Sequence, residues 1–219
     1  MCFSAAASFT AGIGLVGVGA VTASRAGGRA ELPFALIPGL FGIQQLIEGG
    51  VWLTFAHDAP LANMVLTYAY SFFSHVLWPV YVPIAVLLLE PEAWRRRLLS
   101  AIAVAGAAVG LYLLYFLVTE PIVSEVVDKH ISYQSPHFYV GAVMTLYVLA
   151  TCVSSLVSSC GTIRWFGAAT FVALVAAYAF YAYWFISVWC FFAAILSVIV
   201  LVHVFRARPG EARDRAMAG

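Results

Sequence analysis

One carboxyl group interrupts the second long apolar stretch of the chain, which runs over Leu32–Thr54. Glu48 has Gln44 one helical turn before it and Trp52 one turn after it on the same face, with Gln45 alongside. A carboxyl group in apolar surroundings is protonated, paired with a cation or bound to a metal ion. A neutral acid can donate a proton, so Glu48 is a candidate acid–base catalyst and the neighbouring side chains are candidate substrate contacts. The alternative is a neutral Glu48 that only hydrogen-bonds a neighbouring helix and stabilises the bundle.

A histidine lies near the middle of the third apolar stretch, Leu61–Leu89. Ser71 lies one helical turn before His75, and Trp78 lies one turn after it. A histidine at membrane depth serves as a metal ligand, as a proton relay or as a hydrogen-bonded structural group. We predict that His75 is the catalytic partner of the acidic residue, and that Ser71 and Trp78 contact a substrate.

Two of the four cysteines, Cys2 and Cys190, are predicted on the outer side of the membrane. Two neighbouring thiols outside the cytoplasm can form a disulfide. The alternative is thiolate chemistry or metal binding, for which both cysteines are candidates, with Trp189 as a neighbouring substrate contact. The other two cysteines, Cys152 and Cys160, are predicted at the inner end of the fifth helix, reduced and structural.

Five side chains of metal-ligand type could meet in one outer cavity: Cys2, Glu48, His75, His137 and Cys190. Thiolate, imidazole and carboxylate ligands together suit zinc or copper. No pair among them has the short spacing of an HExxH or CxxC motif. The residue types therefore indicate zinc or copper, and the spacing adds no support.

These residues are positioned by seven apolar stretches that we predict to be transmembrane helices, since about 20 residues cross a bilayer. They cover Ser8–Ser24, Leu32–Thr54, Leu61–Leu89, Leu98–Thr119, Pro136–Val157, Ile163–Phe180 and Trp184–Phe205. The predicted fold class is an all-α, seven-helix polytopic membrane protein. Residues 1–207 form the transmembrane domain, and residues 208–219 form a short cytoplasmic tail.

Ten of the eleven basic residues fall on one side of this topology. They are Arg25, Arg29, Arg95, Arg96, Arg97, Arg164, Arg206, Arg208, Arg213 and Arg215. Short cytoplasmic loops carry the excess of Lys and Arg, so the N-terminus is predicted outside and the C-terminus inside. A cleaved signal peptide is not expected, because Met1–Thr10 has no positively charged region.

The composition supports a membrane protein and argues against a nucleic-acid partner. The chain is 63% hydrophobic and 10% charged, with a formal net charge of +1. Soluble domains carry about 25% charged residues. The expected partners are therefore the lipid bilayer and an apolar small molecule or lipid, and no nucleic acid is expected.

Two further segments have predicted roles. The glycines and alanines of the first helix allow close backbone approach, so we expect this helix inside the bundle. Ile122, Val126 and Val127 would share one face of a short helix in the loop 120–135. We expect this amphipathic helix to lie over the outer mouth of the bundle, as a lid or as a simple tether.

Three segments resemble an uncharacterised family of bacterial seven-helix membrane proteins whose members open with an MCFSA-type N-terminus. They are Met1–Phe9, Leu40–Gly49 and Ser187–Ala194. The resemblance extends over essentially the whole chain. It implies a multi-pass protein of the bacterial inner membrane and draws attention to Cys2, Glu48, Trp189 and Cys190, but it implies no activity.

The segment Ser71–His75 also resembles the SxxxH element of the alkaline ceramidase and progestin-receptor-like membrane hydrolases. That family holds zinc with further histidines spaced HxxxH near the end of the chain, where this sequence has only His203. Half of the zinc site is missing, so membership of that family is not expected. Retinal proteins are excluded because the only lysine, Lys129, lies in a loop.

Two functions remain open from the sequence. The first is a membrane-embedded enzyme that acts on a lipid-like or apolar substrate, with Glu48 as acid–base group or metal ligand. The second is a small-solute transporter or ligand sensor. It would have a three-plus-one-plus-three helix layout, because Ser8–Gly12 is echoed by His137–Gly141 and inverted or parallel repeats are typical of transporters.

Overall fold

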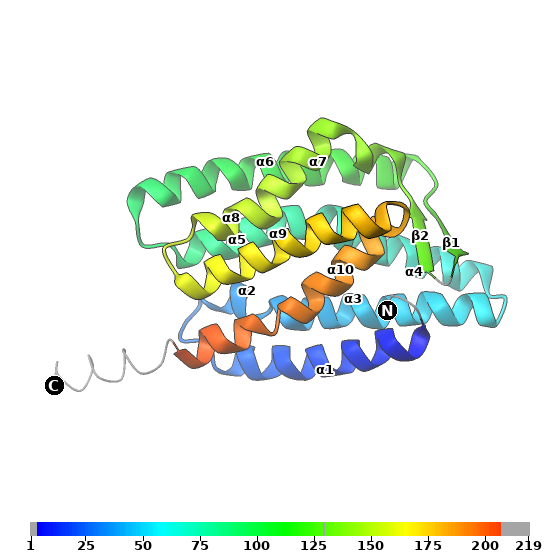
Figure 1. Ribbon diagram of the computed structural model, residues 1–219, viewed down its shortest axis with the longest axis horizontal. Coiled ribbons are helices and arrows are strands. Elements are labelled where there is room, and N and C mark those ends of the chain that lie inside the picture. The colour runs from blue at the N-terminus through cyan, green and yellow to red at the C-terminus, as the bar shows by residue number, and fades with distance from the viewer. Residues whose placement is uncertain (1–3, 129, 207–219) are drawn as a thin grey trace.

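The computed structural model describes residues 4–128 and 130–206. Its long helices lie side by side along one axis (Figure 1). The α-helices are α1 Ala5–Ser24, α2 Leu32–Ala35, α3 Ile37–Ala56, α4 Pro60–Ser71, α5 Trp78–Leu89, α6 Ala93–Thr119, α7 Gly141–Val148, α8 Ser154–Val157, α9 Gly161–Tyr181 and α10 Phe185–Leu196. Two π-helical segments, Phe72–Leu77 and Leu149–Val153, join α4 to α5 and α7 to α8. Short 3-10 helices cover Pro136–Tyr139 and Ala182–Trp184.

Six helical spans of the described chain are long and apolar enough to cross a membrane. They are Ala5–Ser24, Leu32–Ala56, Pro60–Leu89, Ala93–Thr119, Gly161–Tyr181 and Phe185–Arg206. The remaining apolar helix, Gly141–Val157, is shorter. A helical membrane protein is therefore supported, whereas seven spans and an outer N-terminus remain predictions. The tail at 208–219 lies outside the described residues.

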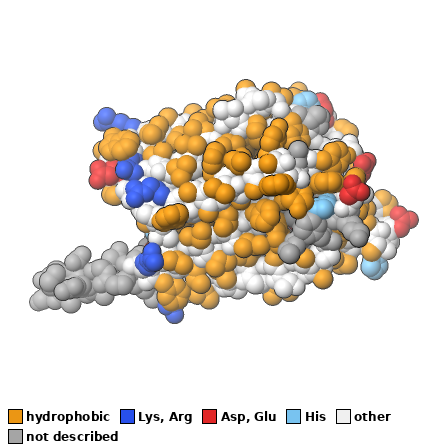
Figure 2. Space-filling view, in the orientation of Figure 1, with side chains coloured by type: hydrophobic (Ala, Val, Ile, Leu, Met, Phe, Trp, Pro, Cys, Tyr) orange, Lys and Arg blue, Asp and Glu red, His pale blue; other side chains and the backbone are white. Residues whose placement is uncertain are grey.

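Charged side chains separate along the axis of the bundle (Figure 2). The arginines gather at one end, called here the arginine-bearing end, where the connections α1–α2, α5–α6 and α8–α9 lie (Figures 1 and 2). Acidic side chains are prominent at the opposite end, and hydrophobic side chains cover the face between (Figure 2). This distribution is the one expected of a membrane-spanning bundle whose arginine-bearing end is cytoplasmic.

The loop 120–135 is a β-hairpin, so the predicted amphipathic helix is wrong. β1, Val123–Val127, pairs antiparallel with β2, His130–Gln134. Valine and isoleucine are β-branched and favour strands. Asp128 has a positive φ of 48°, which Asp tolerates and which suits a tight hairpin turn. Ile131 and Tyr133 of β2 are buried.

Helix α1 lies at the edge of the bundle (Figure 1), so the prediction that it is packed inside is wrong. Gly12 and Gly19 allow one face to contact α3 closely, because a Cβ on Gly19 would meet the Gly39 backbone at 2.4 Å. The opposite face is open. Gly14 and Gly17 have no neighbour within 4 Å, and Ile13 is 67% exposed. Gly12 and Gly19 therefore serve the close contact of α1 with α3.

The π-helical segment beside α6 has an identifiable cause. Pro79 has no N–H to donate to the carbonyl of His75, and the Trp78 N–H instead bonds the Phe73 carbonyl five residues earlier. Such π-turns are frequent at functional sites. The widened turn leaves the Pro79 carbonyl close to α6, where a Cβ on Gly106 would lie only 2.0 Å from that oxygen.

A Gly106→Ala variant should therefore be less stable than the wild-type protein. Overpacking of a tight core typically costs about 1–3 kcal/mol, and the added methyl group would clash with the Pro79 backbone carbonyl, which cannot rotate away. Gly14→Ala is the matched control, since it adds a methyl group in open space and a helical Gly→Ala change stabilises by about 0.5–1 kcal/mol. Thermal unfolding in detergent followed by circular dichroism checks both. Equal midpoints for the two variants would contradict the packing of α6 on Pro79.

Candidate functional site

Glu48 of α3 is completely buried, with 0% of its surface exposed. Its Oε1 accepts a hydrogen bond of 2.6 Å from the Ser187 hydroxyl of α10. Its Oε2 is buried and has no hydrogen-bond partner among the described residues. The carboxyl group is therefore held by one oxygen, while the other remains available to a ligand or to water.

The two glutamines that precede Glu48 are also only partly satisfied. Gln44 Oε1 accepts a 2.7 Å hydrogen bond from Trp78 Nε1. Gln44 Nε2 and both side-chain polar atoms of Gln45 are buried with no hydrogen-bond partner within the described part of the chain. Buried polar groups are normally hydrogen-bonded, and each unmade bond costs about 1–3 kcal/mol. This group on α3 therefore has the chemistry of a binding site for a small polar group.

Cys190 joins the same group from α10. Its thiol lies beside Gln44, Tyr70 and Glu48 and is free of disulfide bonds. The disulfide considered between Cys190 and Cys2 is therefore not formed here, and Cys2 itself lies outside the described residues. A buried thiol in this position lines the site as a small apolar group with a weak donor.

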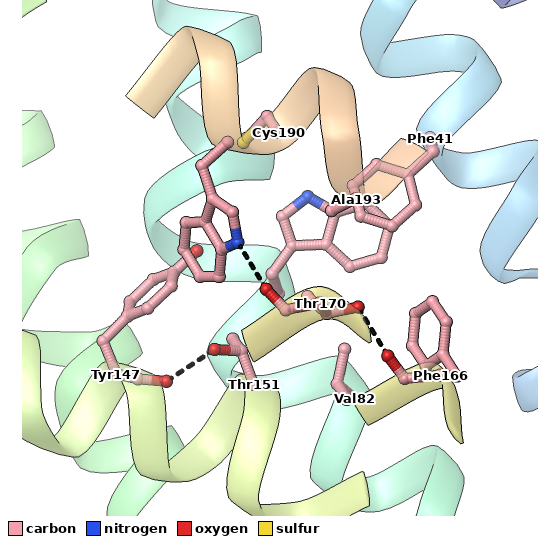
Figure 3. A pocket seen from close by; sticks show the side chains of 10 residues that line it. Phe41, Val82, Tyr147, Thr151, Phe166, Thr170, Cys190 and Ala193 are labelled. Carbon is pink, nitrogen blue, oxygen red and sulfur yellow. Dashed lines mark hydrogen bonds between the residues drawn. The ribbon is translucent and has the colours of Figure 1, made fainter. Parts of the chain in front are cut away.

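An apolar cavity of about 30 Å³ adjoins this group (Figure 3). It is lined by Phe41, Trp78, Val82, Tyr147, Thr151, Phe166, Thr170, Trp189, Cys190 and Ala193. The two threonines bond backbone carbonyls of their own helices, Thr151 to Tyr147 and Thr170 to Phe166 (Figure 3). Their hydroxyl protons are thus occupied, and the wall is mostly aromatic. The cavity has room for about one or two water molecules.

Trp78 and Trp189 both line this cavity, and their role as substrate contacts stays a prediction. Trp78 stacks on Phe41 with ring centroids 3.8 Å apart. Trp189 donates to the Thr170 carbonyl at 3.3 Å. Trp52 is half-buried, and its Nε1 is buried without a partner among the described residues.

His75 is fully buried but has its contacts in a second group. Its Nδ1 lies 2.8 Å from the Ser74 hydroxyl, and its ring packs 4.9 Å from that of Phe138. Its Nε2 and the Ser71 hydroxyl are buried with no partner among the described residues. No contact joins His75 to Glu48 among these, so the two groups are separate candidate sites.

The expected metal centre gains no support. His137 pairs at the surface with Glu120, Nε2 to Oε2 at 2.9 Å, and its ring stacks on Phe116 at 3.6 Å. It is therefore directed away from the buried polar groups. Within residues 4–128 and 130–206, no three His, Cys, Asp or Glu side chains are grouped as metal ligands. Zinc or copper remains an expectation from residue types.

The hairpin covers the site at the end opposite the arginine-bearing end. Tyr133 of β2 stacks on Tyr70 at 4.3 Å, and Tyr70 lies beside Cys190. On β1, Ser124 contacts Thr67 of α4, with 2.7 Å between their hydroxyl oxygens. The segment predicted as a lid or a tether is thus a hairpin that contacts α4, and its role stays a prediction.

Sequence reasoning missed Ser187 and Tyr70 as members of this site. Both are buried, and both come from helices other than α3. The available signal was the spacing of Ser187 and Cys190, which places a hydroxyl and a thiol on one face of a helix. The partner across the bundle was not identifiable from spacing alone.

The whole chain matches the model of a family of unknown function, DUF6629, over residues 1–215. The chain therefore belongs to that family. No curated protein and no solved structure matches it significantly. Family membership is consistent with the resemblance drawn from Met1–Phe9, Leu40–Gly49 and Ser187–Ala194, and it brings no activity with it.

Proposed function

We propose that this chain is a membrane-embedded enzyme that acts on an apolar or lipid-like molecule, with Glu48 as its acid–base group. The observation behind the proposal is the buried Glu48 Oε2, which has no partner among the described residues while Ser187 holds Oε1. A carboxyl group held by one oxygen keeps its orientation and can give or take a proton with the other.

The Nε2 of Gln44 and the side-chain amide of Gln45, which have no hydrogen-bond partner among the described residues, would bind the polar group of the substrate. Together they offer N–H donors and a carbonyl acceptor next to the carboxyl group. A hydroxyl or carbonyl group of the substrate would form hydrogen bonds with them. This arrangement favours a molecule with one small polar group over a highly charged one.

The aromatic cavity would receive the apolar part of the substrate. Its present volume of about 30 Å³ is far below the 300–1,000 Å³ typical of ligand pockets. Substrate entry therefore requires helices to separate, and α10 is the element whose movement would open both the cavity and the contact of Ser187 with Glu48. A path from the bilayer suits a substrate that is itself dissolved in the membrane.

The proposed location is the bacterial inner membrane, with seven spans, the N-terminus outside and the arginine-bearing end in the cytoplasm. The support is the gathering of arginines at one end of the bundle (Figure 2) and the preference of short cytoplasmic loops for Lys and Arg. Glu48 would then lie in the outer half of the membrane, beneath the hairpin.

A small-solute transporter is the second candidate, and one observation favours it. The helices α4–α5 and α7–α8 are each interrupted by a π-helical segment, Phe72–Leu77 and Leu149–Val153. Interrupted helices form the binding sites of many transporters. A transporter would require a path to the arginine-bearing end as well, which distinguishes it from an enzyme open to the bilayer only.

The proposal is tested by comparing the lipids of membranes that contain wild-type protein with those that contain Glu48→Gln. Mass spectrometry of the extracted lipids should reveal a species consumed or produced only by the wild type, because an amide cannot donate a proton as a carboxylic acid does. Glu125→Gln is the matched control, since Glu125 is exposed on the hairpin. Identical lipid profiles for wild type and Glu48→Gln at equal protein levels would refute the proposed enzyme.

A further inference from the structure

Three reactive side chains meet at the arginine-bearing end, far from Glu48. Cys160 lies in the connection between α8 and α9, and its Sγ is 3.5 Å from Nδ1 of His203. The other ring nitrogen, Nε2, lies 3.4 Å from Glu31 Oε1 in an ion-pair contact, although Oε1 accepts no hydrogen bond from the described residues. Glu31 is fixed in turn, because its Oε2 accepts a 2.5 Å hydrogen bond from the Gly27 N–H. Thiol, imidazole and carboxylate thus follow one another in a line.

The order of these groups is that of a nucleophile, a base and a group that orients the base. His203 is held further by the ring of Phe34, which meets it edge-on with centroids 5.3 Å apart. The His203 and Glu31 side chains are 11% and 13% exposed, and Cys160 is half-buried. A small reagent could therefore reach the sulfur while the imidazole stays largely shielded from water.

The thiol is placed where its ionised form is favoured. The hydrogen bond with His203 is the largest cause that lowers the pKa of Cys160 from 9.0 to about 7, against the opposing effect of burial. The backbone N–H groups of Ile163 and Thr162, at the start of α9, act in the same direction. A helix N-terminus and a neighbouring imidazole are the surroundings in which thiolates react at neutral pH.

The same geometry argues against a metal site. Sulfur and carboxylate contact opposite nitrogens of one imidazole ring, so the three groups do not converge on a common point. They are accordingly absent from any group of metal ligands in the described chain. The line of contacts suits proton transfer from the thiol to the ring.

We infer that Cys160, His203 and Glu31 form a nucleophilic cysteine site that accepts an acyl group from an activated ester or thioester. The sulfur attacks the carbonyl carbon and forms an S–C bond, while His203 takes the thiol proton. The bond from that carbon to the leaving oxygen or sulfur breaks, and His203 returns the proton to the leaving group. Water can then hydrolyse the acyl-Cys160 thioester to a carboxylic acid and the free thiol.

The surroundings favour a carbonyl substrate. Attack on a carbonyl places negative charge on its oxygen, and the N–H groups of Thr162 and Ile163 are already beside the sulfur. Donors in such a position stabilise the oxyanion. The site lies at the predicted cytoplasmic membrane surface, where Arg164 follows one turn into α9, and an acyl chain could extend along the apolar helices.

The test uses the full-length protein in detergent with p-nitrophenyl acetate as the activated ester. Wild type should release p-nitrophenolate in a burst and carry an acetyl group on the Cys160 peptide, detected by mass spectrometry. Cys160→Ser and His203→Gln should lose the burst at pH 7. In His203→Gln the pKa of the Cys160 thiol should return to 9.0, and the fraction of thiolate at pH 7 then falls about fiftyfold. Glu31→Gln should slow acylation less, because it orients the ring and does not carry the proton.

A second measurement reads the ionisation of the Cys160 thiol directly. Alkylation of Cys160 by iodoacetamide, read from the Cys160 peptide, should rise with a midpoint near pH 7 in wild type, since the thiolate is the reactive form. His203 faces the sulfur, Glu31 contacts the far side of the His203 ring, and Glu90 accepts a hydrogen bond from the neighbouring Ser159 N–H, so these groups shape the pH profile of alkylation. His57→Gln is the control, because His57 is exposed. A midpoint near pH 9, or alkylation at pH 7 without acetylation, would overturn the inference.

Discussion

A Glu48→Met variant should unfold at the same temperature as the wild-type protein or at a higher one, and should lose the wild-type effect on membrane lipids. Methionine fills a similar volume and has no polar group that requires a partner. The substitution would remove the buried Glu48 Oε2, which lacks a hydrogen-bond partner among the described residues. An unmade hydrogen bond costs about 1–3 kcal/mol, so this removal offsets the loss of the bond from Ser187.

The direction of the stability change separates the two interpretations of Glu48. A residue whose role is to hold α3 to α10 would leave the bundle less stable when its hydrogen bond is removed. If Glu48 is instead maintained for chemistry, its replacement is expected to raise the stability of the protein, since active sites trade stability for function. The measurement is thermal unfolding in one detergent at one heating rate, followed by circular dichroism, with lipid profiles from the same cells.

Ser187→Ala serves as the companion variant. It removes the hydroxyl that donates to Glu48 Oε1 and should lower stability by about 1–3 kcal/mol. The Glu48→Met change instead removes both carboxyl oxygens, so no buried carboxyl oxygen is left without a donor. If Glu48→Met lowers the unfolding temperature as much as Ser187→Ala does, the carboxyl group is structural and the proposed enzyme loses its main support.

The sequence was sufficient to predict most of the helices, whereas the membrane depth of the rare polar residues stays a prediction. Long apolar stretches at the expected length left little alternative to helices, and α9 at Gly161–Tyr181 contains the predicted Ile163–Phe180. Glu48, Gln44 and Gln45 share one helix, so spacing alone placed them together. The chemistry of the site was therefore readable wherever one element carried it.

The spacing of residues along the sequence could not predict which side chains pair across different helices. Ser187 reaches Glu48 over 139 positions of sequence, and Cys160 reaches His203 over 43. Cys160 was expected to be only structural for that reason. The hairpin was missed because valine and isoleucine satisfy both a helical and an alternating pattern over a few residues.

Glu90→Gln should destabilise the bundle strongly, because one carboxylate joins two connections at the arginine-bearing end. Glu90 Oε2 accepts a 2.7 Å hydrogen bond from the Ser159 N–H, and Oε1 accepts one of 3.2 Å from the Glu92 N–H. Beside it, Arg95 donates to the Val157 carbonyl at 2.6 Å. Hydrogen bonds to a charged group contribute about 1.5–3 kcal/mol each, and an amide weakens both bonds while offering an N–H that meets N–H donors.

The loss should depend on pH in a defined direction. Burial alone would raise the pKa of Glu90, but the hydrogen bonds from Ser159 and Glu92 and the charge of Arg95 outweigh it and lower the pKa below 4.5. A carboxyl group whose pKa is depressed by folding stabilises the protein above its unfolded pKa, and this stabilisation is lost as the pH falls through the folded value. The gap between wild type and Glu90→Gln should be full at pH 7 and shrink below pH 4.5.

Glu92→Gln is the matched control, because Glu92 is exposed and makes no side-chain capping bond. Thermal unfolding of the three proteins between pH 3.5 and 7.5 measures the effect. A gap that persists unchanged at pH 3.5 would contradict the role of the charge. The same variant reports on Cys160, which follows Ser159 directly. If Glu90 positions this connection, Glu90→Gln should also slow the alkylation of Cys160 at pH 7, which Glu92→Gln should leave unchanged.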